Sequence, residues 1–149
     1  MPSPRTADEI FAELRDRRVC GVVHAGVVAA SDLPTVAAAF GLAPDVATYR
    51  AIDPEEARRV LIRTLHRDLA YDAEIMPMVD ARRLASEVLR VMPDGQLWTN
   101  GSYGSPATVL TNRVTVGPSW NPATSATFDA GVIVVGSVLS ACVWVEDED

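Results

Sequence analysis

The sequence predicts an α+β fold, with a mainly antiparallel sheet formed by C-terminal hairpins and packed against about four helices from the N-terminal two-thirds. Two patterns predict this fold. Before residue 95, apolar residues recur at helical spacing; after it, valine-rich runs that are alternating or continuously apolar indicate strands. The chain has 149 residues, no internal repeat and no long linker, so we expect one domain over residues 1–149.

The predicted helices are recognised by apolar stripes and by their end signals. The first is predicted over residues 7–17, and a short second helix begins at Ser31 or Asp32. The third has the clearest start, because Asp53 can accept hydrogen bonds from the first-turn N–H groups. The fourth is predicted over residues 80–92. The residues expected to be buried are Ile10, Phe11, Leu14, Leu33, Val36, Ala37, Phe40, Ala57, Leu61, Leu65, Leu69, Ala81, Leu84, Ala85, Val88 and Leu89.

The β-rich segments are mostly C-terminal. The predicted strands cover residues 19–30, 96–99, 109–116, 127–135 and 138–145. The first is either one bent strand or a tight hairpin, because glycines interrupt it. Residues 127–135 are apolar on both faces, which predicts a central strand, and 138–145 is its antiparallel partner. Asn100-Gly101 predicts a two-residue hairpin turn, because both positions tolerate positive φ.

Charge and composition narrow the classes of partner and chemistry. The formal net charge of −7 argues against nucleic acid or an anionic membrane surface as the main partner. All 13 basic residues are arginine, so a reaction that depends on lysine, such as Schiff-base formation, is excluded. The two cysteines offer no disulfide framework and no zinc-binding spacing, so we expect no metal and no cofactor. No apolar run suits a membrane span or a signal peptide, which predicts a cytoplasmic protein.

The tryptophans give the sharpest functional signal. Alternation along the predicted strands places Trp98 and Trp144 on otherwise polar faces of the sheet, and Trp120 lies in a Gly- and Pro-containing loop. Indole rings on a polar surface are typical of recognition sites. The competing interpretation is that a helix packs over this face and buries them.

The C-terminal acidic run adds to this signal. It continues directly from the last predicted strand, so its carboxylates are expected near the tryptophans, where they suit a basic protein partner. We therefore hypothesise a non-catalytic, inhibitor-like or immunity-like protein that neutralises a basic partner. Its predicted partner-binding residues are Trp98, Trp120, Asp129, Trp144, Glu146, Asp147, Glu148 and Asp149.

The alternative hypothesis is a small enzyme or a small-molecule-binding domain. Its pocket would lie between the sheet and the helix after Asp53, with Cys20, His24, His66 or Tyr103 as polar groups. Cys20 and His24 share a face of a regular strand, although a free cysteine is usually a small core residue. A third possibility is a subunit whose apolar strands extend across a homodimer.

Two charged patterns on the helices remain. Arg59, Arg63 and Arg67 recur every four residues and could bind phosphate or carboxylate, but we interpret the row as a solvated helix face. We give the same interpretation to the acidic residues near the end of this helix, which lack the pattern of a calcium-binding loop: Asp68, Asp72 and Glu74.

Overall fold

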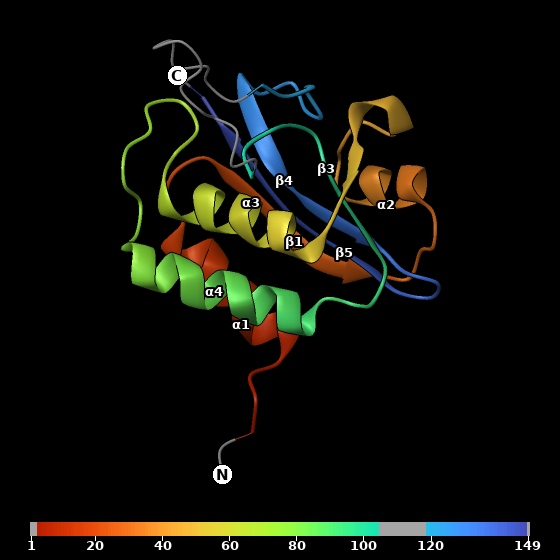
Figure 1. The fold of residues 1–149 in the computed structure, drawn as a ribbon, viewed down its shortest axis with the longest axis horizontal. Helices are drawn as coiled ribbons and strands as arrows, with labels where there is room; N and C mark the ends of the chain where they lie inside the picture. Colours follow the sequence, from red (N-terminus) through yellow and green to blue (C-terminus); the bar gives the residue numbers. More distant parts are fainter. Residues whose placement is uncertain (1–2, 105–118, 149) are drawn as a thin grey trace.

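Five antiparallel strands form one sheet in the computed structural model, which describes residues 3–104 and 119–148 (Figure 1). The strands are β1 (Val22–Val28), β2 (Arg50–Ile52), β3 (Gln96–Thr99), β4 (Phe128–Val135) and β5 (Ser140–Asp147). The helices are α1 (Ala7–Arg17), α2 (Leu33–Ala39), α3 (Pro54–His66) and α4 (Met78–Val91), with a 3-10 turn, η1 (Val46–Thr48). The predicted α+β fold is confirmed.

The strand order is β1-β5-β4-β3-β2, which places β4 and β5 in the interior of the sheet. They form the predicted C-terminal hairpin, in which Val132 pairs with Val143. All but the two end residues of β4 are buried, as expected for a central strand covered on both faces. The three-residue strand β2 was not predicted, because it is too short to show an alternating pattern.

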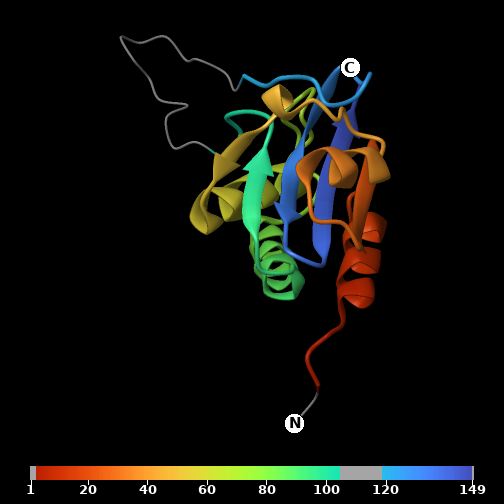
Figure 2. The same ribbon diagram turned by 90° about the vertical axis from the view of Figure 1, so that its right-hand side faces the viewer.

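Helices cover both faces of the sheet (Figure 2). On one face, the apolar stripes of α1, α3 and α4 pack against alternate strand residues, including Val132 and Val143. On the other face, α2 packs against the intervening residues, including Ile133 and Trp144. Within the described residues, no helix is long and apolar enough to cross a bilayer.

Local signals explain the start and end of α3, the helix that carries the arginine row. The Asp53 carboxylate accepts a hydrogen bond from the Glu56 N–H at 2.8 Å, and Pro54 occupies the first helical position. The helix ends at His66, and Arg67 has an extended backbone. The buried side of α3 faces the sheet, so its arginines lie on the outer side.

One expectation about a turn is corrected, and one open alternative about a strand is decided. Asn100-Gly101 is not a hairpin turn, because Gly101 forms a β-bridge with Trp120 and the Asn121 N–H donates to the Asn100 carbonyl at 2.8 Å. The buried Asn100 side chain donates to Asp129 instead of occupying a turn. The segment over 19–30 forms one strand, β1, and the predicted strand over 109–116 lies outside the described residues.

Candidate functional site

The expectation that Trp144 lies on an exposed polar face is wrong. Its side chain is 0% exposed, because α2 and the segment that leads to β2 cover this side of the sheet. The Tyr49 ring contacts the indole edge-to-face, with centroids 5.8 Å apart, and Trp144 Nε1 donates to the Asp129 carboxylate at 3.1 Å. Trp144 is therefore a core residue and cannot touch a partner in this fold.

Two of the predicted acidic contacts are also buried. Asp129 accepts hydrogen bonds from the Asn100 side chain and from the backbone N–H groups of Ala123 and Thr124. Asp147 accepts two from Arg18, at 2.9 and 2.6 Å, and one from the Leu69 N–H at 2.8 Å. Both carboxylates hold the fold together, which corrects their assignment to a partner-binding surface.

The other predicted contact residues are at least partly exposed or lie outside the described part of the chain. Trp98 is half-buried on the same face as Trp144. Trp120 is also half-buried and stacks on Phe128, with centroids 5.3 Å apart. Glu146 is partly exposed and pairs with His24, Glu148 is exposed, and Asp149 is outside the described residues.

The structure does not bring Cys20, His24 and His66 into one pocket. Gly21 has a φ of 69°, so strand β1 begins only at Val22 and Cys20 does not continue its alternation. His24 pairs across the sheet with Trp144, on the α2 face, and its Nε2 lies 2.5 Å from the Glu146 carboxylate. His66 is on α3, which packs on the opposite face of the sheet.

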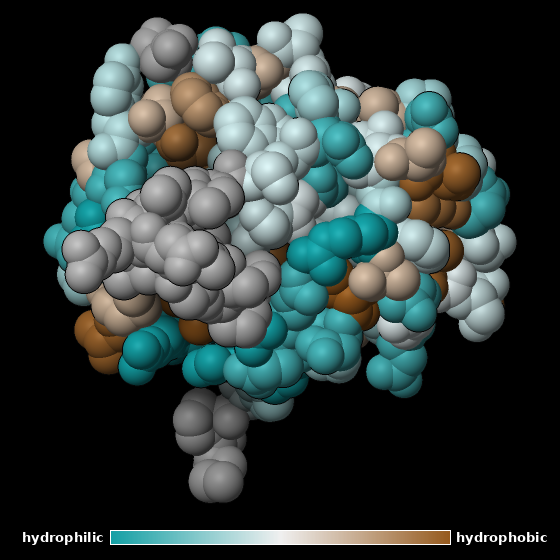
Figure 3. All heavy atoms as spheres, turned by 45° about the horizontal axis from the view of Figure 1, so that its top comes forward, coloured by the Kyte–Doolittle hydropathy of each residue, from teal (hydrophilic) through white to brown (hydrophobic). Residues whose placement is uncertain are grey.

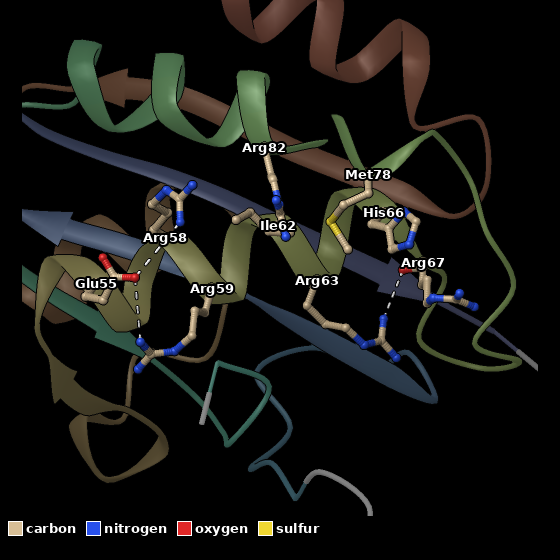
Figure 4. Close-up of a pocket in the computed structure, with 9 residues that line it drawn as sticks. All are labelled: Glu55, Arg58, Arg59, Ile62, Arg63, His66, Arg67, Met78 and Arg82. Carbon is tan, nitrogen blue, oxygen red and sulfur yellow. Dashed lines mark hydrogen bonds and ion pairs between the residues drawn. The ribbon is translucent and has the colours of Figure 1, made fainter. Parts of the chain in front are cut away.

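A groove of about 750 Å³ lies between α3 and α4 (Figure 4). We call it the arginine groove, and its lining residues are Glu55, Arg58, Arg59, Ile62, Arg63, His66, Arg67, Met78 and Arg82. Five of these nine residues are arginines, in a chain whose formal net charge is −7. The groove is therefore rich in positive charge, whereas the chain as a whole is negatively charged.

Helical spacing explains which of these side chains lie in the same row. The predicted row of Arg59, Arg63 and Arg67 is one wall, and a second row at the same spacing holds Arg58, Ile62 and His66. Packing of α4 against α3 adds Met78 and Arg82, which are one turn apart on α4. Sequence spacing reveals the first row, but only the packing of two helices reveals that three rows line one groove.

Contacts outside the groove hold two of the arginines in place. Arg63 contacts the Asp72 carboxylate at 2.9 Å, donates to the Arg67 carbonyl at 3.2 Å, and lies 5.7 Å from the centroid of the Tyr103 ring. Arg59 Nε donates to the Gly104 carbonyl at 2.6 Å. Figure 4 shows both side chains on the side of α3 away from α4, so these contacts hold their guanidinium groups at the outer edge of the groove.

Few carboxylates compensate these charges. The Glu55 carboxylate is 3.9 Å from Arg58 and 3.8 Å from Arg59, at the outer limit of an ion pair. Arg82 makes no hydrogen bond or ion pair with another residue of the described ranges. With Asp72 at Arg63 and Glu74 at 3.9 Å from the His66 Nδ1, three carboxylates of the described ranges face five guanidinium groups, and the groove is net positive.

His66 and Met78 are neighbours in the groove (Figure 4). The His66 Nδ1 lies 2.8 Å from the Met76 carbonyl oxygen, which can only accept a hydrogen bond, so Nδ1 carries the proton and the ring is fixed. Met78 is 38% exposed and lies beside His66 in the groove (Figure 4). The groove thus combines guanidinium groups with an accessible apolar surface.

Outside the groove, the face drawn in Figure 3 shows exposed hydrophobic residues in small groups separated by hydrophilic ones. Among the residues that the structure describes, no group of three or more His, Cys, Asp or Glu side chains could hold a metal ion. No protein-family model, curated protein or solved structure matches this chain. The arginine groove is therefore assigned on its own geometry and chemistry.

Proposed function

We propose that this protein is a non-catalytic binding domain that holds an anionic ligand in the arginine groove. The observation that carries the proposal is the gathering of five arginines from α3 and α4 around one groove, in an acidic chain. Each guanidinium is a planar fork that can donate two hydrogen bonds to a phosphate or carboxylate. A concave site of one sign of charge also concentrates its field and attracts ions of the opposite sign.

Binding is favoured over catalysis by the kinds of residue that line the groove. Among the residues that the structure describes, the lining holds no serine, cysteine, threonine or aspartate that could act as a nucleophile or a general base. Its histidine keeps Nε2 as a possible base when Nδ1 donates to the Met76 carbonyl, but no nucleophile of the described lining lies beside it, and Glu55 faces Arg58 and Arg59. This retains our expectation of a binding protein but moves the binding surface from the tryptophans to the arginines.

The test is isothermal titration of the protein with inorganic pyrophosphate at low salt. We expect saturable binding that weakens as salt is added, because salt screens partly exposed charges. Arg82→Gln should weaken binding about tenfold, the loss expected for one charge-assisted hydrogen bond. Arg90→Gln is the matched control, because Arg90 is exposed on the same helix but does not line the groove. Equal binding by wild type and Arg82→Gln would contradict the proposal.

A second candidate function is the binding of a basic protein partner. It is favoured by the partly exposed stack of Trp120 on Phe128, near which Glu148 accepts a hydrogen bond from the Thr127 hydroxyl at 2.5 Å. An aromatic anchor beside a carboxylate suits a cationic surface. The test is co-purification from host lysate: a basic protein retained at low salt by wild type and lost with Trp120→Ala and Glu148→Gln would support it.

A further inference from the structure

We propose that the arginine groove takes a small phosphate ester with an apolar or aromatic body. This inference rests on the proposed function and names the ligand class for the same site. It is carried by the order of the side chains along the groove, by their charge balance and by the size of the groove.

The order of the residues along α3 places an apolar surface between charged ends. Arg58 and Arg59 lie at one end of the groove and Arg67 at the other, while Ile62 and Met78 lie between them (Figure 4). Inorganic phosphate could contact guanidinium groups but would leave this apolar surface exposed. A ligand with an apolar body attached to its anionic group would cover it.

The charge balance favours a phosphate ester over a single carboxylate. The five arginines of the groove face three carboxylates among the described residues, Glu55, Asp72 and Glu74, which leaves an excess of two positive charges. A phosphate monoester carries a charge of about −1.5 to −2 at neutral pH and has three acceptor oxygens, so it can engage several guanidinium forks at once. A carboxylate carries one charge and two oxygens.

The size of the groove supports a ligand larger than an ion. Its volume of about 750 Å³ falls within the range of small-molecule sites, which is roughly 300–1,000 Å³. Guanidinium planes also stack on aromatic rings, so the arginine walls can cover a flat body as well as hold its phosphate. Phenyl phosphate is therefore a suitable probe, because it joins one phosphate to one flat apolar ring.

The experiment is calorimetric titration of the full chain with phenyl phosphate, inorganic phosphate and phenol. We expect phenyl phosphate to bind about tenfold more tightly than inorganic phosphate, and phenol to bind least. Met78→Gln keeps the length of this exposed side chain but removes its apolar character. This substitution should weaken the binding of phenyl phosphate several-fold and leave the binding of inorganic phosphate unchanged, whereas Arg82→Gln should weaken the binding of both.

The outcomes separate the two proposals. Equal affinity for phenyl phosphate and inorganic phosphate, both reduced by Arg82→Gln, would overturn the ligand class and leave the anion site intact. No binding of either phosphate would overturn both proposals. Much tighter binding of a phosphotyrosine peptide than of phenyl phosphate would assign the groove to a modified protein and overturn the small-molecule assignment.

Discussion

The carboxylate of Asp72 lies 2.9 Å from the Nη2 of Arg63, at the edge of the arginine groove. Asp72 reaches this position from a backbone with a φ of 56°, the left-handed region in which aspartate and asparagine are tolerated better than most residues. Its own carbonyl also accepts a hydrogen bond from Arg67 at 2.6 Å. One exposed loop residue thus supplies its carboxylate to one arginine of the groove and its backbone carbonyl to another.

The pairing predicts that Asp72 competes with the ligand. Asp72→Asn keeps the left-handed backbone but removes the charge, so Arg63 becomes available to an incoming anion. We expect pyrophosphate to bind about fivefold more tightly, because an exposed ion pair contributes roughly 1 kcal/mol or less. Titration calorimetry measures the change. Asp94→Asn is the control, since it removes an exposed carboxylate outside the groove, and an equal gain there would show a general charge effect instead.

A second prediction concerns the buried pair of Arg18 and Asp147. Arg18 donates two hydrogen bonds to Asp147 and a third, at 2.7 Å, to the Thr64 carbonyl of α3. The side chain of Arg18 is 0% exposed, so its charge is uncompensated once the carboxylate is lost. Asp147→Ala should lower the free energy of unfolding by about 3–5 kcal/mol in urea titrations.

The exposed neighbour of Asp147 provides the comparison. Glu148→Gln should change the free energy of unfolding by no more than about 0.5 kcal/mol, as is usual for surface substitutions. Similar losses in the two variants would mean that the contact of Asp147 with Arg18 is not what stabilises the end of β5.

Local signals predicted the elements well because each depends on few residues. The bounds expected for α1 are those observed, and α3 begins immediately after Asp53, since apolar stripes and capping residues act within one or two turns. The hairpin of β4 and β5 was likewise predicted, from the continuous apolar run over residues 127–135 and the segment over 138–145 that follows it. None of these features depends on distant parts of the chain.

The candidate site could not be predicted because it depends on packing between elements. Alternation placed Trp144 on a polar face, but it carried no information that α2 and Tyr49 cover that face. The arginine row was visible in the sequence, but its interpretation as a solvated face lacked the contribution of Met78 and Arg82 from α4. Sequence spacing locates residues on one helix, whereas a groove needs two.

A third prediction tests the cysteine alternative. Burial raises the pKa of the Cys20 thiol above its ordinary value, and it raises that of the fully buried Cys142 further. Cys20 should therefore react more slowly with a thiol reagent at pH 7 than a free cysteine does, and Cys142 only after unfolding. His24→Gln should leave the Cys20 rate unchanged, because His24 contacts Glu146. A rate that falls several-fold in this variant would restore the cysteine–histidine pair as a candidate.

The last prediction concerns stability at low pH. Hydrogen bonds from Arg83, Arg5 and Arg17 lower the pKa of Glu13 from 4.5 to about 2, although burial opposes the shift. A carboxylate whose folded-state pKa is depressed stabilises the protein fully above its unfolded pKa, and this stabilisation is lost as pH falls toward the folded value. The free energy of unfolding should therefore fall between about pH 5 and pH 2.

The test is urea unfolding of wild type and Glu13→Gln at pH 7 and pH 3. Because Glu13→Gln removes this titration, the free energy of unfolding should differ less between the two pH values for the variant than for wild type. If Glu13→Gln leaves the difference between pH 7 and pH 3 unchanged, groups other than Glu13 cause the loss of stability at low pH.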